Sequence, residues 1–483
     1  MRFATIQRIL GLLLMVSSIT MVPPLVIAAW LDESSRLDFT VTMLGLVAVG
    51  ALFWYPVRRH RQELRVRDGF VVVALFWLVL ALVGAIPFML AEQPEMNFTD
   101  AMFESTSGLT TTGATVLTGI DRLPRSIQFY RQELQWLGGM GIIVLAVAVL
   151  PMLGIGGMQL YRAETPGPMK DNKLTPRITE TAKALWYIYL GLTVSCAVAY
   201  WIAGMDVFDA ISHSFSTVAI GGFSTHDLSI GYFNSPAIEL VAVVFMLLAG
   251  INFSLHFLAW RSVSVLAYFR DSEFKTYITV LGLTATITVS YLYLNGTFPR
   301  LGDALHHGIF QVVSIGTTTG FTTAAYFHWP GFLPVMLLFT SFIGGCAGST
   351  GGGMKVIRFL LLFKQGIREI SRLVHPNAQI PVKVGNKAMP ERVVEAVWGF
   401  FATYVGCFTL MMLVLLATGL DQVTAFSAVA ACLNNLGPGL GEVGYHYGEI
   451  NDTAKWVLSM AMILGRLEIF TLLVLLSPAF WRR

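Results

Sequence analysis

Charged residues are scarce in this sequence. Only 13% of the 483 residues are Asp, Glu, Lys or Arg, whereas soluble domains carry about 25%. The hydrophobic share is 55% and the mean hydropathy is +0.66. Apolar runs of about 20 residues, the length that crosses a bilayer as a helix, recur as far as Phe480 and leave no room for a large soluble domain. The composition predicts an all-α polytopic membrane protein.

The cysteine pattern, the net charge and the lack of a catalytic motif argue against further classes of protein. The four cysteines have neither metal-ligand spacing nor a pairing pattern: Cys196, Cys346, Cys407 and Cys432. A net charge of +3 is too small to indicate nucleic acid as a partner. No arrangement of nucleophile, base and oxyanion stabiliser stands out, so we do not expect an enzyme.

The orientation in the membrane is predicted from the basic residues. The first apolar run, Ile9 to Trp30, is too long for a signal peptide and lacks a convincing cleavage site, so we expect it to be retained. Basic residues gather in alternate loops: Arg58, Arg59, Arg61, Arg65 and Arg67; Arg162, Lys170, Lys173, Arg177 and Lys183; Arg261, Arg270 and Lys275; Arg358, Lys364, Arg368, Arg372, Lys383, Lys387 and Arg392; Arg482 and Arg483. By the positive-inside rule these loops and both termini are expected to be cytoplasmic.

A short segment recurs four times in one register. Counting back 13 positions from four glycines reaches its four expected starts, which are Asp100, Asp209, His307 and Thr424. Each segment of about ten residues is too short to span a bilayer and suits a re-entrant helix. Three of the starts are good N-cap residue types, and His307 is a weaker one.

A full apolar span precedes and follows each short segment. The expected spans are Gly69 to Leu90, Trp186 to Ala203, Tyr277 to Leu294 and Val393 to Leu415 before it, and Leu134 to Leu153, Ile238 to Trp260, Phe332 to Phe363 and Trp456 to Leu476 after it. We therefore expect ten spans, arranged as four helix–pore-helix–helix repeats around a central pore plus two extra N-terminal transmembrane helices. The predicted boundaries are 1–68 for the extra helices and 69–161, 162–265, 266–385 and 386–483 for the repeats.

An uncharged tetrapeptide closes each short segment. The four are Thr110-Thr111-Thr112-Gly113, Ala219-Ile220-Gly221-Gly222, Thr317-Thr318-Thr319-Gly320 and Asn434-Asn435-Leu436-Gly437. Irregular backbone at membrane depth must be buried in protein or line a cavity. Rings of carbonyl oxygens can replace the water shell of a cation, and glycine permits the backbone angles that such a loop needs. Threonine hydroxyls and asparagine amides can brace the loops or add oxygen ligands.

A pore and close helix packing are the two interpretations of these loops. Small residues also let membrane helices approach one another. For a single loop, close helix packing explains the small residues about as well as a pore does. Four loops in one register favour the pore. The short helices would then direct their negative C-terminal ends at the membrane centre, where they stabilise a cation.

A glycine-rich segment interrupts the expected span from Phe332 to Phe363. Six of its ten residues are glycine: Gly344, Gly345, Cys346, Ala347, Gly348, Ser349, Thr350, Gly351, Gly352 and Gly353. Each glycine inside a helix costs about 1 kcal/mol relative to alanine, so a continuous helix is not expected. The residue order does not match a phosphate-binding loop. The segment is a candidate gate, and a kink for close packing is the alternative.

Few charged residues fall inside the apolar spans. Arg466 lies within the last one, where an ionised side chain needs water or a partner, so we expect it at the pore wall near the glycine-rich segment; a purely structural salt bridge is the alternative. Glu104 could attract ions or brace its helix, and Glu442 could line an outer vestibule. The remaining candidates show no metal-ligand spacing and are assigned no chemistry: His213, His226, His306 and His307.

The motifs TTTGATV, AIGGFSTH, TTTGFTT and NNLGPGLGEVG resemble the Trk/Ktr/HKT superfamily of potassium transporters, most closely its bacterial TrkH members. The resemblance covers essentially the whole chain. It implies that the last glycine of each tetrapeptide belongs to a K+ selectivity filter and that Gly344 to Gly353 form an intramembrane gate loop beneath it, with Arg466 in the ion pathway. Since serine at the position of Gly113 accompanies sodium preference in plant relatives, glycine there favours potassium.

The resemblance also implies a cellular setting. It predicts potassium uptake across the bacterial inner membrane through a gated pore, a homodimer with one pore in each protomer, and a cytosolic TrkA-like ring that binds the nucleotides, so that this chain carries no organic cofactor. An ion-coupled (H+ or Na+) K+ symporter is the alternative, although such transporters usually show inverted repeats and acidic residues within spans. The basic stretch Lys364 to Arg392 offers a surface for an acidic partner or for membrane lipid.

Overall fold

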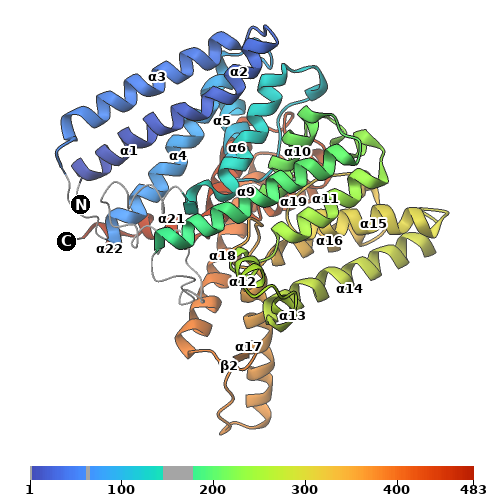
Figure 1. The fold of residues 1–483 in the computed structure, drawn as a ribbon. Coiled ribbons are helices and arrows are strands. Elements are labelled where there is room, and N and C mark those ends of the chain that lie inside the picture. The colour runs from blue at the N-terminus through green and yellow to red at the C-terminus, as the bar shows by residue number, and fades with distance from the viewer. Residues whose placement is uncertain (1–2, 61–65, 145–177, 483) are drawn as a thin grey trace.

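The computed structural model describes residues 3–60, 66–144 and 178–482 (Figure 1). The predicted basic residues Arg61, Arg65, Arg162, Lys170, Lys173, Arg177 and Arg483 and the predicted boundary at 161–162 lie outside these ranges. The first half of the chain contains α1 (Phe3–Ser17), η1 (Ser18–Met21), α2 (Val22–Trp30), α3 (Arg36–Trp54), η2 (Tyr55–Val57), α4 (Val66–Leu90), α5 (Phe98–Leu109), η3 (Ile120–Arg122), α6 (Arg125–Val144), α9 (Ile178–Ile202), α10 (Val207–Ala219) and η5 (Ser229–Phe233).

The second half is also helical apart from one small hairpin. It contains α11 (Pro236–Ala249), α12 (Phe253–Ser262), α13 (Leu266–Arg270), α14 (Ser272–Leu294), α15 (Leu301–Gly316), η6 (Tyr326–His328), α16 (Leu333–Ile343), α17 (Val356–Val374), β1 (Lys383–Val384), β2 (Lys387–Ala388), α18 (Glu391–Ala417), α19 (Gln422–Leu433), η7 (Gly441–Val443), α20 (Asp452–Arg466), α21 (Phe470–Leu476) and α22 (Pro478–Trp481). The two strands pair antiparallel, with Lys383 opposite Ala388.

Six helices within the described ranges are long and apolar enough to cross a membrane, and two bent pairs raise the number to eight. Large apolar side chains on their outer faces are exposed, for example Leu44 and Leu52 of α3, as lipid contact requires. The other two expected spans differ: α6 runs to the edge of a described range, and α16 has only 11 residues.

The predicted starts of the short helices are wrong by a few residues. Helices α5, α10 and α19 begin earlier and are capped three residues upstream, by Asn97, Asp206 and Asp421. Each cap accepts a hydrogen bond from the backbone N–H of the residue predicted as the start: Asp100, Asp209 and Thr424. The cap position favours polar residues because its side chain supplies the accepting oxygen, and acidic residues such as Asp100 and Asp209 are favoured in the first turn by the helix dipole. His307 lies inside α15, which begins at Leu301 without a side-chain cap.

Two further spans are broken, in addition to the predicted break between α16 and α17. Helices α11 and α12 meet at 93°, because Asn252 caps a new helix by accepting a hydrogen bond from the Ser254 N–H. Helices α20 and α21 meet at 115°. Here Glu468 and Ile469 have φ angles of +54° and +59°, which end a right-handed helix. Arg466 is therefore the last residue of α20 rather than a residue inside a continuous span.

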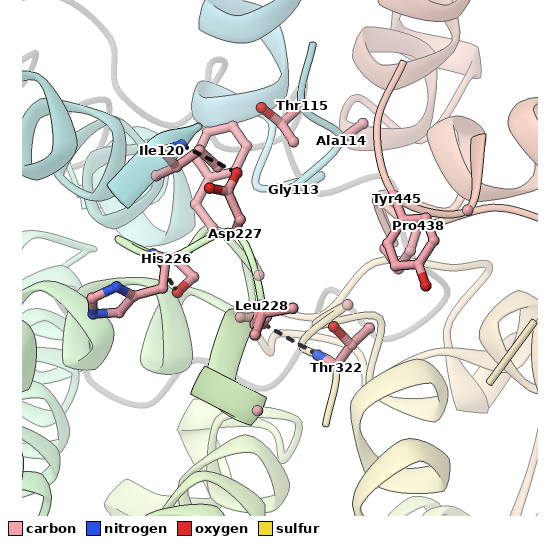
Figure 2. Close-up of a pocket in the computed structure, with 18 of the residues that line it drawn as sticks. Gly113, Ala114, Thr115, Ile120, His226, Asp227, Leu228, Thr322, Pro438 and Tyr445 are labelled. Atoms are coloured by element: carbon pink, nitrogen blue, oxygen red, sulfur yellow. Dashed lines mark hydrogen bonds between the residues drawn. The ribbon is translucent and has the colours of Figure 1, made fainter. Parts of the chain in front are cut away.

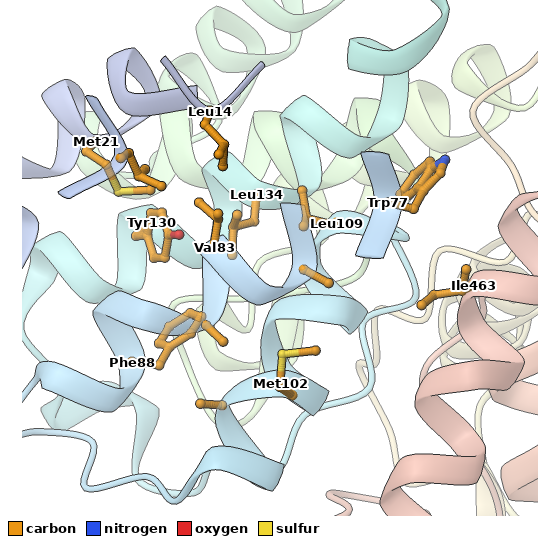
Figure 3. Packing of buried hydrophobic residues seen from close by; sticks show 14 of the residues in the cluster. Leu14, Met21, Trp77, Val83, Phe88, Met102, Leu109, Tyr130, Leu134 and Ile463 are labelled. Atoms are coloured by element: carbon orange, nitrogen blue, oxygen red, sulfur yellow. The ribbon is translucent and has the colours of Figure 1, made fainter. Parts of the chain in front are cut away.

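The N-terminal helices support the first short helix through an apolar core. Leu14 of α1 and Met21 of η1 pack in one cluster with Val83 and Phe88 of α4 (Figure 3). Leu109, the last residue of α5, joins the same cluster and is 5% exposed. The end of α5, and the loop that follows it, are thus held by packing that extends to the N-terminus.

Candidate functional site

The four tetrapeptides adopt the same backbone conformation. The second residue of each is left-handed, with φ between +53° and +69°: Thr111, Ile220, Thr318 and Asn435. The closing glycines have φ between +80° and +97°. In every loop the third residue donates its N–H to the carbonyl five positions earlier, as in Thr112 to Ser107 at 2.9 Å. A left-handed residue with a β-carbon costs about 1–2 kcal/mol, so four such residues are held by their surroundings.

The closing glycines form a closed ring of contacts. A β-carbon placed on any of them would lie 2.0 to 2.6 Å from the carbonyl oxygen of the third residue in another loop. The pairs run once around the four loops: Gly113 to Gly221, Gly222 to Thr319, Gly320 to Leu436, and Gly437 to Thr112. The glycines also line one cavity of about 280 Å³. Figure 2 shows residues of all four loops around it, among them Gly113, His226, Thr322 and Pro438. The four loops therefore converge on a common centre.

Hydroxyl and amide side chains of the loops bond to protein. The hydroxyls of Thr110 and Thr112 are 2.7 Å apart, and the third loop repeats this pair at 2.8 Å. Asn435 donates to the Thr112 hydroxyl at 3.0 Å and to the Met462 carbonyl at 2.9 Å. Tyr404 donates to the Asn434 side chain at 2.5 Å. Of the two predicted roles, these contacts correspond to bracing.

A buried ion pair links the first and second loops. Arg131 of α6 and Glu104 of α5 are both fully buried and lie 2.8 Å apart. Glu104 also accepts a hydrogen bond from the Val116 N–H, and Arg131 donates to the Ser224 carbonyl at 2.9 Å. The guanidinium stacks over Phe223 at 4.2 Å. The carboxylate of Glu104 thus faces protein and braces its helix.

Gln135 supports the second tetrapeptide, which has no hydroxyl side chain. Its amide nitrogen donates to the Gly221 carbonyl at 2.6 Å, and its oxygen accepts from the Phe223 N–H at 3.0 Å. Neither Arg131 nor Gln135 was predicted as a site residue. Both lie in α6 at a spacing of one helical turn, i and i+4, but the loop that they contact is about 90 residues away in sequence.

The glycine-rich segment lies against the other side of the loops. Its Gly352 N–H donates to the Thr318 hydroxyl at 2.7 Å, and its Gly353 N–H to the Asn434 carbonyl at 2.9 Å. The Thr350 hydroxyl donates to the Val218 carbonyl, just before the second tetrapeptide, at 2.9 Å. The segment therefore contacts the third and fourth tetrapeptides and the end of α10, next to the second tetrapeptide.

Glu273 of α14 also holds this segment. Its carboxylate accepts from the Ala347 N–H at 2.7 Å and from the Ile357 N–H at 3.2 Å. The backbone carbonyl of Gly250, at the break between α11 and α12, accepts from the Cys346 N–H at 2.9 Å. The break that the sequence did not predict is thus a docking point for the segment.

Arg466 joins the segment to α6. It donates to the Thr350 carbonyl at 3.1 Å and to the Gly138 and Gly139 carbonyls of α6 at 2.6 and 3.1 Å. Glu468 forms an ion pair with Arg358 of α17. Arg466 is thus placed beside the glycine-rich segment, in contact with backbone oxygens.

A charged cluster lies at the rim of the cavity. His226 stands 2.5 Å from Asp121 and 3.2 Å from Asp209, and stacks on Tyr232 at 3.5 Å. Burial favours the neutral imidazole, but the two carboxylates outweigh it and raise the pKa of His226. Glu442 is exposed and does not line the cavity as the described residues define it.

The helical fold, with its apolar spans and four converging loops, is that of a polytopic transport protein of the membrane. The chain belongs to the TrkH family: the family model, described as a cation transport protein, matches residues 35–483. It is 60% identical to the "Trk system potassium uptake protein TrkH" of Vibrio parahaemolyticus and 56% identical to that of Escherichia coli, covering 100% of both chains in each case. The crystal structure of the potassium transporter TrkH from V. parahaemolyticus superposes with a TM-score of 0.91 at 57% identity over 100% of both chains. The chain is accordingly a membrane protein.

Proposed function

We propose that this chain is the membrane subunit of a potassium uptake system and that K+ crosses it at the ring formed by the four tetrapeptides. The observation that carries the proposal is the closed circuit of glycine–carbonyl contacts around one cavity. Carbonyl oxygens held around a common centre replace the hydration shell of a cation. The C-terminal ends of α5, α10, α15 and α19 point into the same loops and add partial negative charge there.

We infer that residues Gly344 to Gly353 and Arg466 act as the gate. The segment lies against the third and fourth loops through two backbone N–H groups and against the end of α10, next to the second loop, through the Thr350 hydroxyl, so it obstructs the path that an ion leaving the ring would take. The positive charge of Arg466 beside it repels cations. Moving the segment away from the loops breaks its hydrogen bonds from Gly352, Gly353 and Thr350, each with a net value of about 1 kcal/mol.

We infer four pore repeats after two additional N-terminal helices, with the boundaries predicted from the sequence, in the bacterial inner membrane with both termini in the cytoplasm. The equivalent backbone of the four loops supports the repeat arrangement. The basic loops support the orientation.

We further infer a homodimer and a cytosolic nucleotide-binding ring as partners. Helix α17 projects from the helical body together with the β1–β2 hairpin (Figure 1). It carries exposed apolar side chains at Phe363, Ile367, Ile370 and Leu373 beside the half-buried basic residues Lys364, Arg368 and Arg372. Such a surface suits a protein partner with acidic and apolar groups.

The decisive experiment is rubidium uptake into liposomes that contain the purified chain. Flux that follows the K+ or Rb+ gradient, with a reversal potential independent of pH and Na+, supports a pore. A reversal potential that shifts with either gradient identifies a coupled symporter instead. No alkali-cation flux, with or without a cytosolic regulator, would contradict both.

A further inference from the structure

Three metal-ligand side chains from two helices meet beside the third loop. Glu239 lies in the first turn of α11, and His306 and His307 are neighbours in α15, which packs against α11. One ligand atom from each lies within 4.8 Å of the other two. His306 Nε2 stands 2.7 Å from Glu239 Oε2, and the two imidazole rings are 4.9 Å apart. This set could not be predicted from the sequence, because Glu239 lies 67 positions before His306.

The polar atoms of this cluster are not satisfied by protein. Glu239 is 3% exposed, yet its Oε2 and the facing Nε2 of His306 make no hydrogen bond of acceptable geometry within the described part of the chain. Buried polar atoms normally have partners. A cation shared by the carboxylate and the imidazoles would use these lone pairs. The third ligand is held in orientation, since His307 Nδ1 lies 3.2 Å from the Thr323 hydroxyl, as in sites where a ring nitrogen not used for the metal bonds to a neighbour.

We propose that Glu239, His306 and His307 bind a divalent transition-metal ion such as Zn2+. Two imidazoles and one carboxylate, with a fourth position left for water, are a ligand set typical of zinc. Imidazole favours zinc, nickel and cobalt over the alkali and alkaline-earth cations, which prefer oxygen ligands. The site is therefore chemically distinct from the uncharged oxygen ring of the tetrapeptides, and its occupancy does not depend on the proposed transport function.

The geometry needs only a small side-chain adjustment. Ligands bonded to a tetrahedral zinc ion at about 2.0–2.1 Å are separated by about 3.3 Å. The 2.7 Å pair must open slightly, and the other two pairs, which lie within 4.8 Å, need to change by no more than about 1.5 Å to reach this separation. The side chain of His306 is 32% exposed, which gives an ion access. A bound ion would join α11, whose far end docks the glycine-rich segment, to α15, which ends at the third tetrapeptide.

The test is Co2+ titration of the full chain in detergent, purified without a histidine tag and stripped with a chelator. Visible absorption of Co2+ reports a site with nitrogen and oxygen ligands, and we expect saturation at one ion per chain, reversed by Zn2+. Glu239→Gln, His306→Gln and His307→Gln are each expected to weaken binding by at least about tenfold. His328→Ala is the matched control, because this histidine is exposed and outside the cluster, and it should bind as the parent does.

Several results would overturn the proposal. The first is the absence of saturable Co2+ binding by the parent protein. The second is Co2+ binding as tight as the parent's in all three glutamine variants, and the third is loss of Co2+ binding in His328→Ala. Gel filtration without metal checks that each variant is folded. Should one variant aggregate, the remaining two decide, since each removes a different ligand from the same site.

Discussion

A single methyl group on Gly113 would test whether the ring of glycine–carbonyl contacts determines ion selectivity. In Gly113→Ala the new β-carbon lies 2.2 Å from the Gly221 oxygen, whereas real β-carbons do not approach closer than 3.0 Å. One of the two loops must therefore move by about 0.8 Å, the difference between these distances, because a packed interior cannot absorb the overlap. The φ of +80° adds about 1–2 kcal/mol of backbone strain.

Gly119→Ala provides the matched control. Gly119 has a φ of +70°, close to that of Gly113, but a β-carbon there meets nothing within 4 Å. The two variants share the backbone strain and differ in the displaced carbonyl. We expect the K+ over Na+ permeability ratio to fall by about tenfold in Gly113→Ala, equivalent to about 1.4 kcal/mol, and to be unchanged in Gly119→Ala. Gly113→Ser should lower the ratio in the same direction.

The assay is the reversal potential of reconstituted protein under K+ and Na+ gradients, with thermal melting to confirm folding. An unchanged permeability ratio in Gly113→Ala would refute the role of the ring. An equal loss in Gly119→Ala would show that general backbone strain, and not the displaced carbonyl, is responsible.

Three further predictions concern the groups that hold the loops. Arg131→Met should destabilise the protein by about 3–5 kcal/mol, because it leaves Glu104 as an unpaired buried charge. We expect a lower melting temperature in this variant and a partial recovery when Glu104→Gln is added. A melting temperature equal to that of the parent protein would contradict the prediction. Glu273→Ala removes the acceptor of the Ala347 N–H in the glycine-rich segment and of the Ile357 N–H in α17, which follows it, so rubidium flux without a regulator should rise, and flux at or below the parent level would argue against it. The pKa of His226 is raised in the folded protein, so the protonated side chain stabilises the fold fully below the unfolded pKa of about 6.5. This stabilisation is lost as the pH rises through the higher folded pKa, and the melting temperature should fall between these two pH values. In His226→Gln this fall in melting temperature with pH should be absent.

The register of the four loops could be predicted from the sequence because it depends on local chemistry. Glycine is the residue that a left-handed φ with a close carbonyl neighbour requires, and it recurs 13 positions after a polar residue in all four copies. The helix starts were misplaced because the cap and the third helical residue are both polar. The bends at Asn252 and at Glu468 could not be foreseen, since asparagine and glutamate occur in many unbroken helices and become breaks only through their contacts here.

The residues that support the loops could not be predicted from the sequence, for a different reason. Arg131, Gln135 and Glu273 each act on backbone groups at least 74 positions away, and no periodicity in one sequence connects such distances. In the sequence each of them is only a polar side chain in an apolar region. This indicates that the side chain has a buried partner but does not identify the partner.

The two sides of the loops are held by different kinds of interaction, and this difference bears on gating. On the cavity side, Arg131, Glu104 and Gln135 fix the first two loops through buried, charge-assisted or paired hydrogen bonds, and charge-assisted bonds are about twice as strong as neutral ones. On the other side, the glycine-rich segment contacts the loops by single hydrogen bonds from Gly352, Gly353 and Thr350. Breaking these would leave the bracing on the cavity side intact. If the segment is the gate proposed above, it can leave the ion path while the carbonyl ring keeps its dimensions, so that opening and selectivity would be separate properties of the proposed pore.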